Sequence, residues 1–317
     1  DTFMEEALYS HLGFFNTDQV RSDKEGDFLT SPEVSKYFGK IIRNWINSES
    51  NLKNIIEIGS GTGSLIEQIG IKEITAVELS SSAREELIKK GIDTHTTIDE
   101  LTTKTSDLIF GNEILDNIPC SIGLYKDEGW YEKVVLLEDN SLAYGLRPIR
   151  NEELDWINKN NIVPNEDYEF EIQVNIDKFL NSVIKKINPG KILLFDYGYE
   201  QKNRDKRMYS SLLRTYKNHH LSVDPISDPG NIDITYDVNF SSISSELKYL
   251  GYDVTLKLQR DFLLDNGFNI FFDELQEKYI AAEGIEKLKI NSELNGMKAI
   301  VDSNGLGGFY CLIAEKL

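Results

Sequence analysis

A glycine-rich loop is the feature of this sequence that most constrains the fold. The loop spans residues 57–63 (EIGSGTG), follows the apolar run 54–58 and precedes a helical pattern. Glycine allows a sharp turn and a close approach of a ligand to the backbone, because no Cβ stands in the way. Such a loop between a buried strand and a helix is typical of α/β proteins that bind a nucleotide-like ligand.

Short apolar runs and helical patterns alternate along the rest of the chain. Buried strands are predicted at 54–58, 74–79, 107–110, 191–197, 253–258 and 309–314, and helices at 32–47, 65–70 and 80–91. This alternation predicts an α/β fold with a mostly parallel sheet, since parallel strands are joined by right-handed crossovers. Two stretches break the pattern. The first carries a polar hairpin pattern at 131–148 and a helix at 176–187, and the second, residues 199–240, has few apolar runs.

The charge balance of the chain excludes some partners and favours others. Among 317 residues, Lys and Arg number 34 and Asp and Glu number 53, which gives a net charge of −19. We expect no nucleic-acid binding, because phosphate contacts need a basic face. An acidic surface attracts a basic protein or a cationic small molecule, although an acidic soluble protein without such a partner has the same composition.

The cysteines and the apolar runs indicate where in the cell the protein is expected. Cys120 and Cys311 are the two cysteines, too few for a disulfide framework or a CxxC metal motif. A reducing compartment follows, so we expect a cytoplasmic location, or an organellar matrix if a targeting peptide was removed. No apolar run approaches the roughly 20 residues that span a bilayer, so membrane insertion is not expected.

The spacing in the glycine loop distinguishes two kinds of ligand. A dinucleotide-binding loop reads G-x-G-x-x-G and would need a glycine at Ser64, whereas this loop reads G-x-G-x-G. Glu57 stands two residues before the first glycine, where it would repel a pyrophosphate and attract a cation. S-adenosylmethionine is cationic and has no phosphate. Glu78, at the end of the second predicted strand, could accept both ribose hydroxyls of either ligand, so an NAD-dependent dehydrogenase stays the alternative. A tight turn beside a solvated strand end is the structural alternative.

Seven ordered motifs resemble the MidA family of class I methyltransferases, which has an arginine methyltransferase as its mitochondrial member. They are the aromatic opening 7–15, GDFLTSPE at 26–33, the loop 57–63, GNEILD at 111–116 with Pro119, DYGY at 196–199, the acidic stretch 219–238 and QRDFL at 259–263. Asn117 replaces the usual Ala of the family and Ser60 the common Pro. Both changes are small, so the resemblance extends over nearly the whole chain.

The resemblance implies a Rossmann-like class I methyltransferase fold with S-adenosyl-L-methionine as cofactor. The sheet would be mostly parallel and seven-stranded, with helices on both faces and insertions forming a substrate lid. The implied organisation is a cofactor-capping segment and helix at 1–50, the core at 51–116 and 190–317, an insertion at 117–189 and a lid-like insertion at 199–240. The implied cofactor-binding residues are Thr30, Ser31, Glu57, Gly59, Ser60, Gly61, Gly63, Glu78, Leu79 and Asn112.

Candidate catalytic residues lie where the predicted strands end. Glu113 and Asp116 would grip an arginine guanidinium, because carboxylates can bind two of its N–H groups and aim the third nitrogen. Asp196 is a second candidate, and His220 could act as general base toward a hydroxyl acceptor. The alternative for Glu113 is an acid at a helix N-terminus. Tyr197 and Tyr199 would stack on the guanidinium or form an aromatic wall.

Taken together, these residues predict a methyltransferase that modifies an arginine of a basic protein. A small-molecule O- or N-methyltransferase is the first alternative, because this fold accepts many substrates. A non-catalytic assembly chaperone that kept the fold is the second. No metal is expected, since the histidines and aspartates at 219–237 match no zinc-ligand spacing.

Overall fold

A computed structural model describes most of the chain. The described residues are 1–16, 30–49, 52–101, 106–206, 212–217, 220–221 and 223–316, with only the backbone described at 188, 205, 206, 220 and 221. The first half of the predicted GDFLTSPE motif, the side chain of His220 and all of His219 lie outside the described residues.

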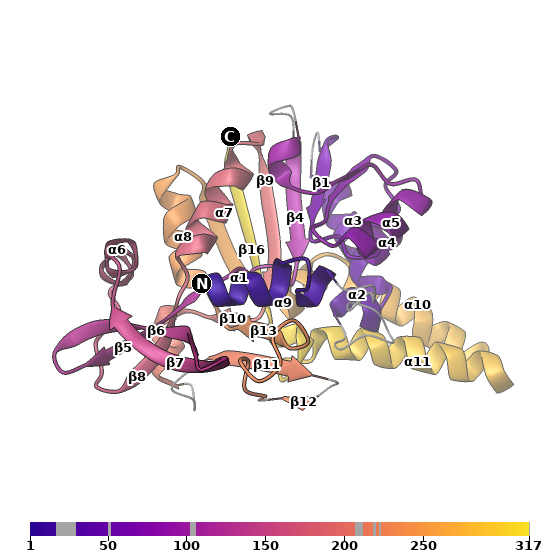
Figure 1. The fold of residues 1–317 in the computed structure, drawn as a ribbon. Coiled ribbons are helices and arrows are strands. Elements are labelled where there is room, and N and C mark those ends of the chain that lie inside the picture. The colour runs from indigo at the N-terminus through magenta and orange to yellow at the C-terminus, as the bar shows by residue number, and fades with distance from the viewer. Residues whose placement is uncertain are drawn as a thin grey trace.

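A seven-stranded sheet forms the centre of the molecule (Figure 1). Its order is β15 (Asp253–Leu258), β16 (Tyr310–Lys316), β9 (Ile187–Asp196), β4 (Ser106–Asn112), β1 (Ile55–Ile58), β2 (Ile74–Val77) and β3 (Thr94–His95). Strands β9, β4, β1, β2 and β3 run parallel, and β16 runs antiparallel between β9 and β15. The mostly parallel, seven-stranded α/β fold expected from the sequence is therefore confirmed.

Helices cover both faces of this sheet. Neighbouring residues of each strand point to opposite faces, so the apolar side chains of one strand are buried on both sides. Ile55 and Ile56 of β1 belong to two different buried clusters. One cluster includes α1 (Thr2–Tyr9), α7 (Val174–Ile184) and α8 (Phe240–Tyr249), and the other includes α3 (Tyr37–Ser48), α4 (Ser64–Ile69), α5 (Ser81–Lys89) and α9 (Gln259–Asp265). Cys120 and Cys311 are free and buried in these clusters.

The helix predicted at 32–47 is in fact two helices. A short helix α2 (Ser31–Val34) ends at Ser35, whose backbone is extended, and α3 begins at Tyr37. Apolar spacing alone could not reveal this break, because Val34 and Phe38 keep helical spacing on either side of it. The break matters because it lets α2 approach the glycine loop while α3 packs on the sheet.

The insertion after β4 contains a separate antiparallel sheet. Its order is β7 (Ser141–Pro148), β6 (Gly129–Glu138), β5 (Ser121–Lys126) and β8 (Tyr168–Ile172). The helix α6 (Asn151–Lys159) lies against β8. The hairpin expected at 131–148 is present. Asp139 and Asn140 turn it with φ values of 46° and 65°, as two-residue hairpins with left-handed central residues do.

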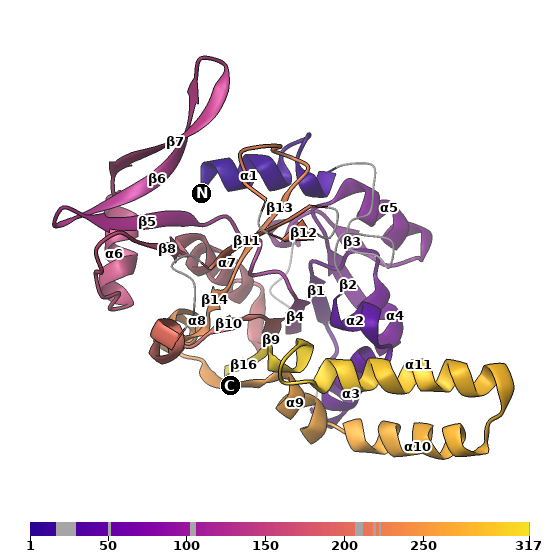
Figure 2. The ribbon, with the colours of Figure 1, turned by 90° about the horizontal axis from the view of Figure 1, so that it is seen from below.

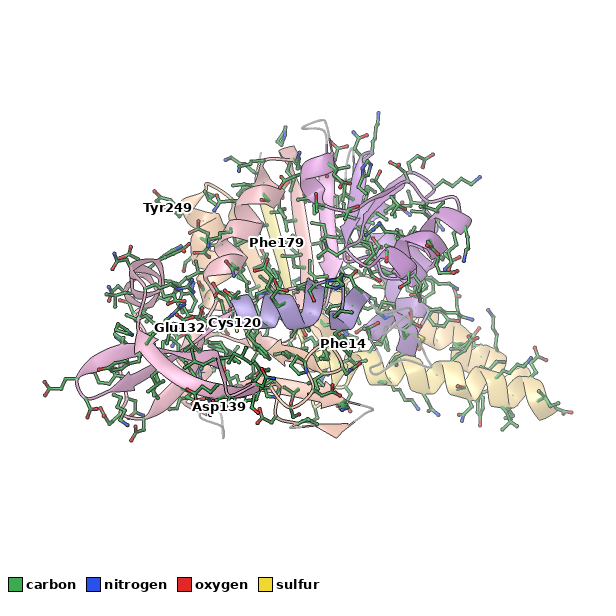
Figure 3. All side chains as sticks on the ribbon, in the orientation of Figure 1. Phe14, Cys120, Glu132, Asp139, Phe179 and Tyr249 are labelled. Atoms are coloured by element: carbon green, nitrogen blue, oxygen red, sulfur yellow. The ribbon has the colours of Figure 1, made fainter. Side chains whose placement is uncertain are left out.

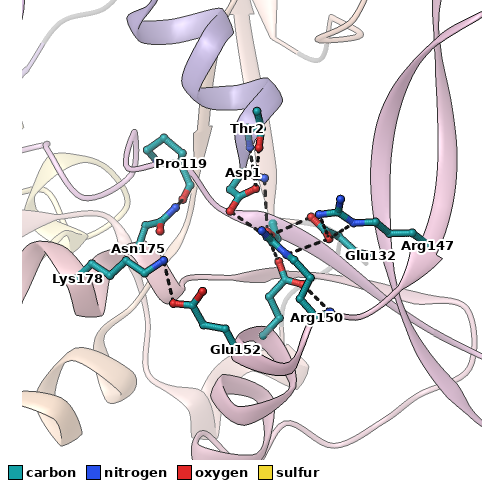
Figure 4. A network of polar contacts seen from close by, with 11 residues as sticks. Asp1, Thr2, Pro119, Glu132, Arg147, Arg150, Glu152, Asn175 and Lys178 are labelled. Carbon is teal, nitrogen blue, oxygen red and sulfur yellow. Dashed lines mark hydrogen bonds and ion pairs between the residues drawn. The ribbon is translucent and has the colours of Figure 1, made fainter.

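A polar network holds this insertion to the N-terminal helix (Figure 4). Arg150 Nη2 lies 2.9 Å from Asp1 Oδ2 and also pairs with Glu153 and Glu132. Arg147 pairs with Glu132 as well, at 2.6 Å from Nη2 to Oε2. Because Glu132 and Glu153 are both 2% exposed, their charges need such partners.

The described residues between 198 and 240 include two small sheets beyond the carboxyl ends of the parallel strands. β10 (Gly198–Tyr199) pairs with β14 (Val238–Asn239), and β11 (Leu213–Lys217) lies between β12 (His220–Leu221) and β13 (Asp233–Tyr236). The three-stranded sheet lies below the main sheet in Figure 1. The sequence showed few apolar runs here because each of these strands is short.

A pair of antiparallel helices projects from the body, and the sequence analysis did not predict it (Figure 2). The pair consists of α10 (Phe268–Ala281) and α11 (Gly284–Val301). The inner end of α11 packs against α2, and a Cβ at Gly296 would lie 2.5 Å from the carbonyl oxygen of Val34. In the described part of the chain, no helix has the length and apolar character required to cross a membrane.

Candidate active site

The glycine loop connects β1 to α4 through three residues with left-handed backbones. The φ values are 68° for Gly59, 52° for Gly61 and 83° for Gly63. A Cβ at Gly59 would lie 2.3 Å from Cγ2 of Ile114, so that position lacks space as well as a favourable backbone for any other residue. The loop thus exposes bare backbone at the carboxyl ends of the central strands.

A cavity of about 260 Å³ lies against this loop. Most of the predicted cofactor-binding residues line it, namely Thr30, Glu57, Gly59, Ser60, Gly61, Glu78, Leu79 and Asn112. Ser31 and Gly63, which were also predicted to bind the cofactor, are not among the residues that line it: Ser31 begins α2, and Gly63 is the N-cap of α4. Glu113, predicted to be catalytic, also lines the cavity.

Aromatic side chains from distant segments close the cavity, and sequence reasoning did not assign them to it. Tyr9 and Phe15 come from the N-terminal segment. Phe179 comes from α7, which lies over one face of the sheet (Figure 3). The aromatic opening motif 7–15 was a usable signal for the first two. Phe179 had none, because it belongs to an ordinary amphipathic helix.

Glu78 joins the glycine loop to the second strand. Its Oε2 accepts a hydrogen bond from the Gly61 N–H and its Oε1 accepts one from the Ser80 N–H, each at 2.8 Å. Burial raises the pKa of this carboxyl, and the two N–H groups oppose that effect. Each carboxylate oxygen keeps a second lone pair, so Glu78 can still accept the hydroxyls of a ribose.

Two buried oxygens in the cavity wall show what kind of ligand fits. Glu57 Oε2 and Asn112 Oδ1 have no hydrogen-bond partner among the described residues. Burial raises the pKa of Glu57 well above its usual value, and an incoming cation would reverse this effect. The lining residues include no Lys or Arg that could neutralise a phosphate. These residues therefore fit S-adenosylmethionine, whose ammonium group supplies donors and positive charge.

Glu113 faces the same cavity from the end of β4. Its Oε1 accepts hydrogen bonds from Asn112 Nδ2 at 2.9 Å and from the Ser31 N–H at 3.4 Å. Burial, followed by the charge of Asp116, raises the pKa of Glu113 to about 8. Residues 113–120 form turns, so Glu113 is not the helix N-terminal acid that the alternative interpretation described.

Asp196, the second candidate for a catalytic carboxyl, supports this loop from behind. It is fully buried, and its Oδ2 accepts from the N–H groups of Leu115 at 2.8 Å and Asp116 at 3.3 Å. Its Oδ1 accepts from the Tyr197 N–H at 2.9 Å. Both oxygens are thus engaged with backbone, and Asp196 does not line the cavity.

Asp116 lies beside Glu113 but points away from the cofactor cavity. It is 4% exposed, and its Oδ2 accepts a hydrogen bond from the Tyr197 hydroxyl at 2.5 Å. Its Oδ1 is buried and has no hydrogen-bond partner in the described ranges.

His220 has its backbone in β12, and its predicted role as a base concerns a side chain outside the described residues.

The tyrosines expected to stack on an acceptor guanidinium stack on arginines of the chain itself. The guanidinium carbon of Arg214 lies 5.1 Å from the ring centroid of Tyr197, and that of Arg204 lies 5.6 Å from Tyr199. Sequence reasoning missed Arg214, and no signal distinguished it from the other Lys and Arg residues of this region. No three metal-binding side chains converge in the described part of the chain.

Comparisons with known proteins agree with this geometry. A sequence model of a family of S-adenosyl-L-methionine-dependent methyltransferases matches residues 38–255. A Caenorhabditis elegans relative, named protein arginine methyltransferase NDUFAF7 homolog, mitochondrial, is 25% identical over 314 residues, which cover 84% of this chain and 71% of that protein. A Danio rerio relative, named protein arginine methyltransferase NDUFAF7, mitochondrial, is also 25% identical, over 323 residues that cover 84% and 72%.

A solved structure has the same fold. It comes from Burkholderia thailandensis, is bound to S-adenosyl-homocysteine, and is similar with a TM-score of 0.86 at 22% identity, covering 99% of this chain and 87% of that one. This likeness confirms the class I methyltransferase architecture.

The names of the relatives correct the expected cellular location. A cytoplasmic location is wrong, because the worm, frog and zebrafish relatives are all named mitochondrial.

Proposed function

The chain belongs to the MidA family of S-adenosyl-L-methionine-dependent methyltransferases, and from this premise we propose that its methyl acceptor is an arginine side chain of a protein. The family match covers more than half of the chain and settles that the protein is a methyltransferase with S-adenosylmethionine as cofactor. The dehydrogenase alternative is therefore wrong. The identity of the acceptor is the part that we propose.

The observation that carries this proposal is the pair of carboxyl groups at the end of β4. Glu113 faces the cofactor cavity, and Asp116 beside it keeps one buried oxygen without a donor. A guanidinium presents several N–H groups in one plane, so it can satisfy two carboxylates at once. An acceptor with a single hydroxyl could not do so, because it has only one donor. The relatives named protein arginine methyltransferases and the net charge of −19 support the same acceptor.

The carboxyl groups have a defined task in this reaction. When bound, S-adenosylmethionine supplies a methyl group that is already activated on a sulfonium. The protein then has to hold the acceptor nitrogen within about 3–3.5 Å of that carbon. An arginine arrives protonated, since its pKa is above 12. Contact with this cation favours the ionised form of Glu113, which then grips two N–H groups.

Glu113 can also accept the proton that the methyl transfer releases. The acceptor nitrogen forms a bond to the methyl carbon as the carbon–sulfur bond breaks, and it releases one proton. The ionised Glu113 carboxylate that grips the bound cation can take that proton and pass it to water. An ordinary solvated glutamate, with a pKa near 4, would hold a proton far more weakly.

The test is a labelling experiment with a matched pair of peptides. The protein and methyl-labelled S-adenosylmethionine are incubated with an arginine-containing basic peptide, and with the same peptide carrying Lys at the arginine position. We expect label only in the arginine peptide, recovered as methylarginine after hydrolysis. A panel of small hydroxyl and amine metabolites is run beside them. Label confined to that panel would refute the arginine acceptor and establish a small-molecule methyltransferase.

A Glu113→Gln variant assigns the role of the carboxyl. We expect its affinity for S-adenosylmethionine, measured by calorimetry, to change less than threefold, because the amide keeps the shape of the side chain. Turnover should fall by roughly 10²–10³-fold, as when a positioned acid–base group is removed. Glu86→Gln, on the surface of α5, is the matched control and should leave both quantities unchanged. If cofactor affinity falls as far as turnover, Glu113 is a cofactor ligand and not part of the acceptor site.

A further inference from the structure

Side chains from three parts of the fold line up behind Asp116. Tyr197, which follows β9, donates its hydroxyl hydrogen bond to Asp116 Oδ2. The guanidinium of Arg214, on β11, lies over the ring of Tyr197 at 5.1 Å from its centroid. Arg214 Nη2 in turn lies 2.6 Å from Oδ1 of Asp237, which is 1% exposed. The result is a continuous stack from Asp237 through Arg214 and Tyr197 to Asp116.

This stack restrains the ring of Tyr197. A guanidinium over an aromatic ring is attracted by its electron-rich face. Phe309 contacts the same tyrosine, with 5.4 Å between the ring centroids. Because the ring is held by both neighbours, its hydroxyl stays within hydrogen-bond distance of a single carboxylate oxygen. That oxygen is Oδ2 of Asp116.

The free oxygen of Asp116 indicates a ligand. A buried carboxylate oxygen without a donor is costly, and such oxygens in native proteins usually have a partner. Asp116 does not line the cofactor cavity, whereas its neighbour Glu113 does. The missing donor is thus better supplied by an acceptor next to Glu113 than by the cofactor.

We propose that Arg214 is a positioning residue of the acceptor site, which acts through the ring of Tyr197 to fix the carboxylate of Asp116 toward the incoming guanidinium. This inference rests on the proposed arginine acceptor. Arg214 itself makes no contact with the acceptor, since a second guanidinium would repel it. Its charge instead balances the acidic groups that surround Asp116.

The groups that face Asp116 come from several elements. They are Glu113 on the same loop, Asp196 and Tyr197 from β9 and its end, Arg214 on β11, Tyr236 on β13 and Tyr9 on α1. Burial raises the pKa of Asp116, and the hydroxyl of Tyr197, the backbone N–H groups of Asp116 and Asn117 and then the charge of Arg214 lower it. Removing the hydroxyl or the charge of Arg214 makes Asp116 harder to ionise, so the carboxylate that binds a cation is present only at higher pH.

The experiment compares pH profiles of kcat/KM for the arginine peptide in three variants. Tyr197→Phe removes the hydroxyl and keeps the ring, and Arg214→Gln removes the charge. Arg214→Gln paired with Asp237→Asn removes both charges, so that no buried carboxylate is left unpaired if the single variant folds poorly. In each variant we expect the acidic limb of the kcat/KM profile to shift to higher pH by at least half a pH unit. At pH 7 we expect kcat/KM to fall at least tenfold, with part of the loss recovered at pH 9.

Two readouts make the test decisive. The dissociation constant for S-adenosylmethionine should change less than threefold in all variants, and Lys217→Gln on the same strand should leave the profile unchanged. Lys217 pairs with Asp228 and does not touch Tyr197 in the described contacts. Equal losses at every pH would overturn the inference, because they indicate a purely structural arginine. If the wild-type protein itself never labels the arginine peptide, the proposed function fails instead.

Discussion

Glu113 has an unusual backbone for a functional side chain. Its φ of 53° lies in the left-handed region, which residues other than glycine, asparagine and aspartate seldom adopt. The backbone N–H of Glu113 donates to the Phe195 carbonyl at 2.8 Å, and this bond to the neighbouring strand holds the conformation. The left-handed turn directs the carboxyl back over the cavity, where a regular continuation of β4 would not place it.

The raised pKa of Glu113 gives a prediction for the pH dependence of the reaction. The carboxyl must be ionised to bind a cationic acceptor, and with a pKa of about 8 it is mostly protonated at pH 7. We expect kcat/KM for the arginine peptide to rise roughly tenfold between pH 7 and pH 9. Initial rates at subsaturating peptide measure this. In Glu113→Gln the residual activity should lack that rise, and an equal rise in the variant would contradict the assignment.

The glycines of the loop give a second prediction at this scale. Gly59→Val would place a branched side chain at a φ of 68° and within 2.3 Å of Ile114. We expect the affinity for S-adenosylmethionine to fall by at least roughly 100-fold, because the displaced loop carries the Gly61 N–H and the cavity wall. Gly61→Val, at a φ of 52°, should have the same effect.

Gly91→Val is the control for backbone strain alone. Gly91 has a φ of 74° and open space around the position of a Cβ. The variant should lose stability, seen as a lower melting temperature, while it keeps cofactor affinity. Equal losses of affinity in the Gly59 and Gly91 variants would mean that general destabilisation, and not the loop, accounts for the effect.

At the scale of elements, α2 is positioned from far along the chain. The fully buried side chain of Gln259, the first residue of α9, shares hydrogen bonds with the Ser31 hydroxyl at 3.1–3.2 Å and donates to the Ile300 carbonyl at 3.0 Å. It therefore joins α2, α9 and α11. Because the N–H of Ser31 also reaches Glu113, this junction sets the distance between the start of α2 and the cavity.

Gln259→Leu tests this junction. The change leaves the Ile300 carbonyl and the Ser31 hydroxyl without their partner, and we expect a loss of about 1–3 kcal/mol in the free energy of unfolding. The KM for S-adenosylmethionine should rise as well, because α2 contributes Thr30 and Pro32 to the cavity wall. Urea unfolding and steady-state kinetics measure the two effects. Unchanged KM with reduced stability would show that α2 does not depend on Gln259 for its position.

At the scale of the whole molecule, the acidic groups gather at one edge of the sheet. Burial raises the pKa values of Glu57, Glu78, Glu113, Asp116 and Asp196. In the unfolded chain such carboxyls have pKa values of about 4. Between that pH and their raised pKa values, the folded protein binds more protons than the unfolded chain. Its stability therefore falls as the pH rises through this interval.

This linkage predicts that the protein without cofactor is more stable at pH 6 than at pH 8. We expect a difference of about 1–3 kcal/mol in the free energy of unfolding from the Glu113 carboxyl alone. Urea unfolding at the two pH values measures it, and Glu113→Gln should reduce the difference. Saturating S-adenosylmethionine should narrow it further, because the bound cation favours the ionised carboxylates. Greater stability at pH 8 would contradict the protonation states described here.

Local sequence was sufficient for much of the fold and for most of the predicted residues that line the cavity. Six of the seven strands follow from apolar runs, whereas the short edge strand β3 was not predicted. The loop 57–63, Glu57 and Glu78 follow from their places at strand ends. These features depend on neighbours in sequence, and their periodicity is visible in the chain. The paired helices α10 and α11 were missed although they are long, because the sequence analysis followed the strands and the motifs between them.

Roles that depend on side-chain direction or on distant partners were decided by tertiary structure. Asp116 and Asp196 look equivalent in sequence, since both lie near the carboxyl ends of strands. Asp196, however, accepts from backbone N–H groups on both oxygens, whereas Asp116 keeps one oxygen free. Arg214, from a segment that looked irregular, meets Tyr197 only because β11 folds beneath the main sheet. Sequence alone determines which groups can ionise and where strands end. Which carboxyl keeps a free oxygen depends on donors brought from elsewhere in the chain.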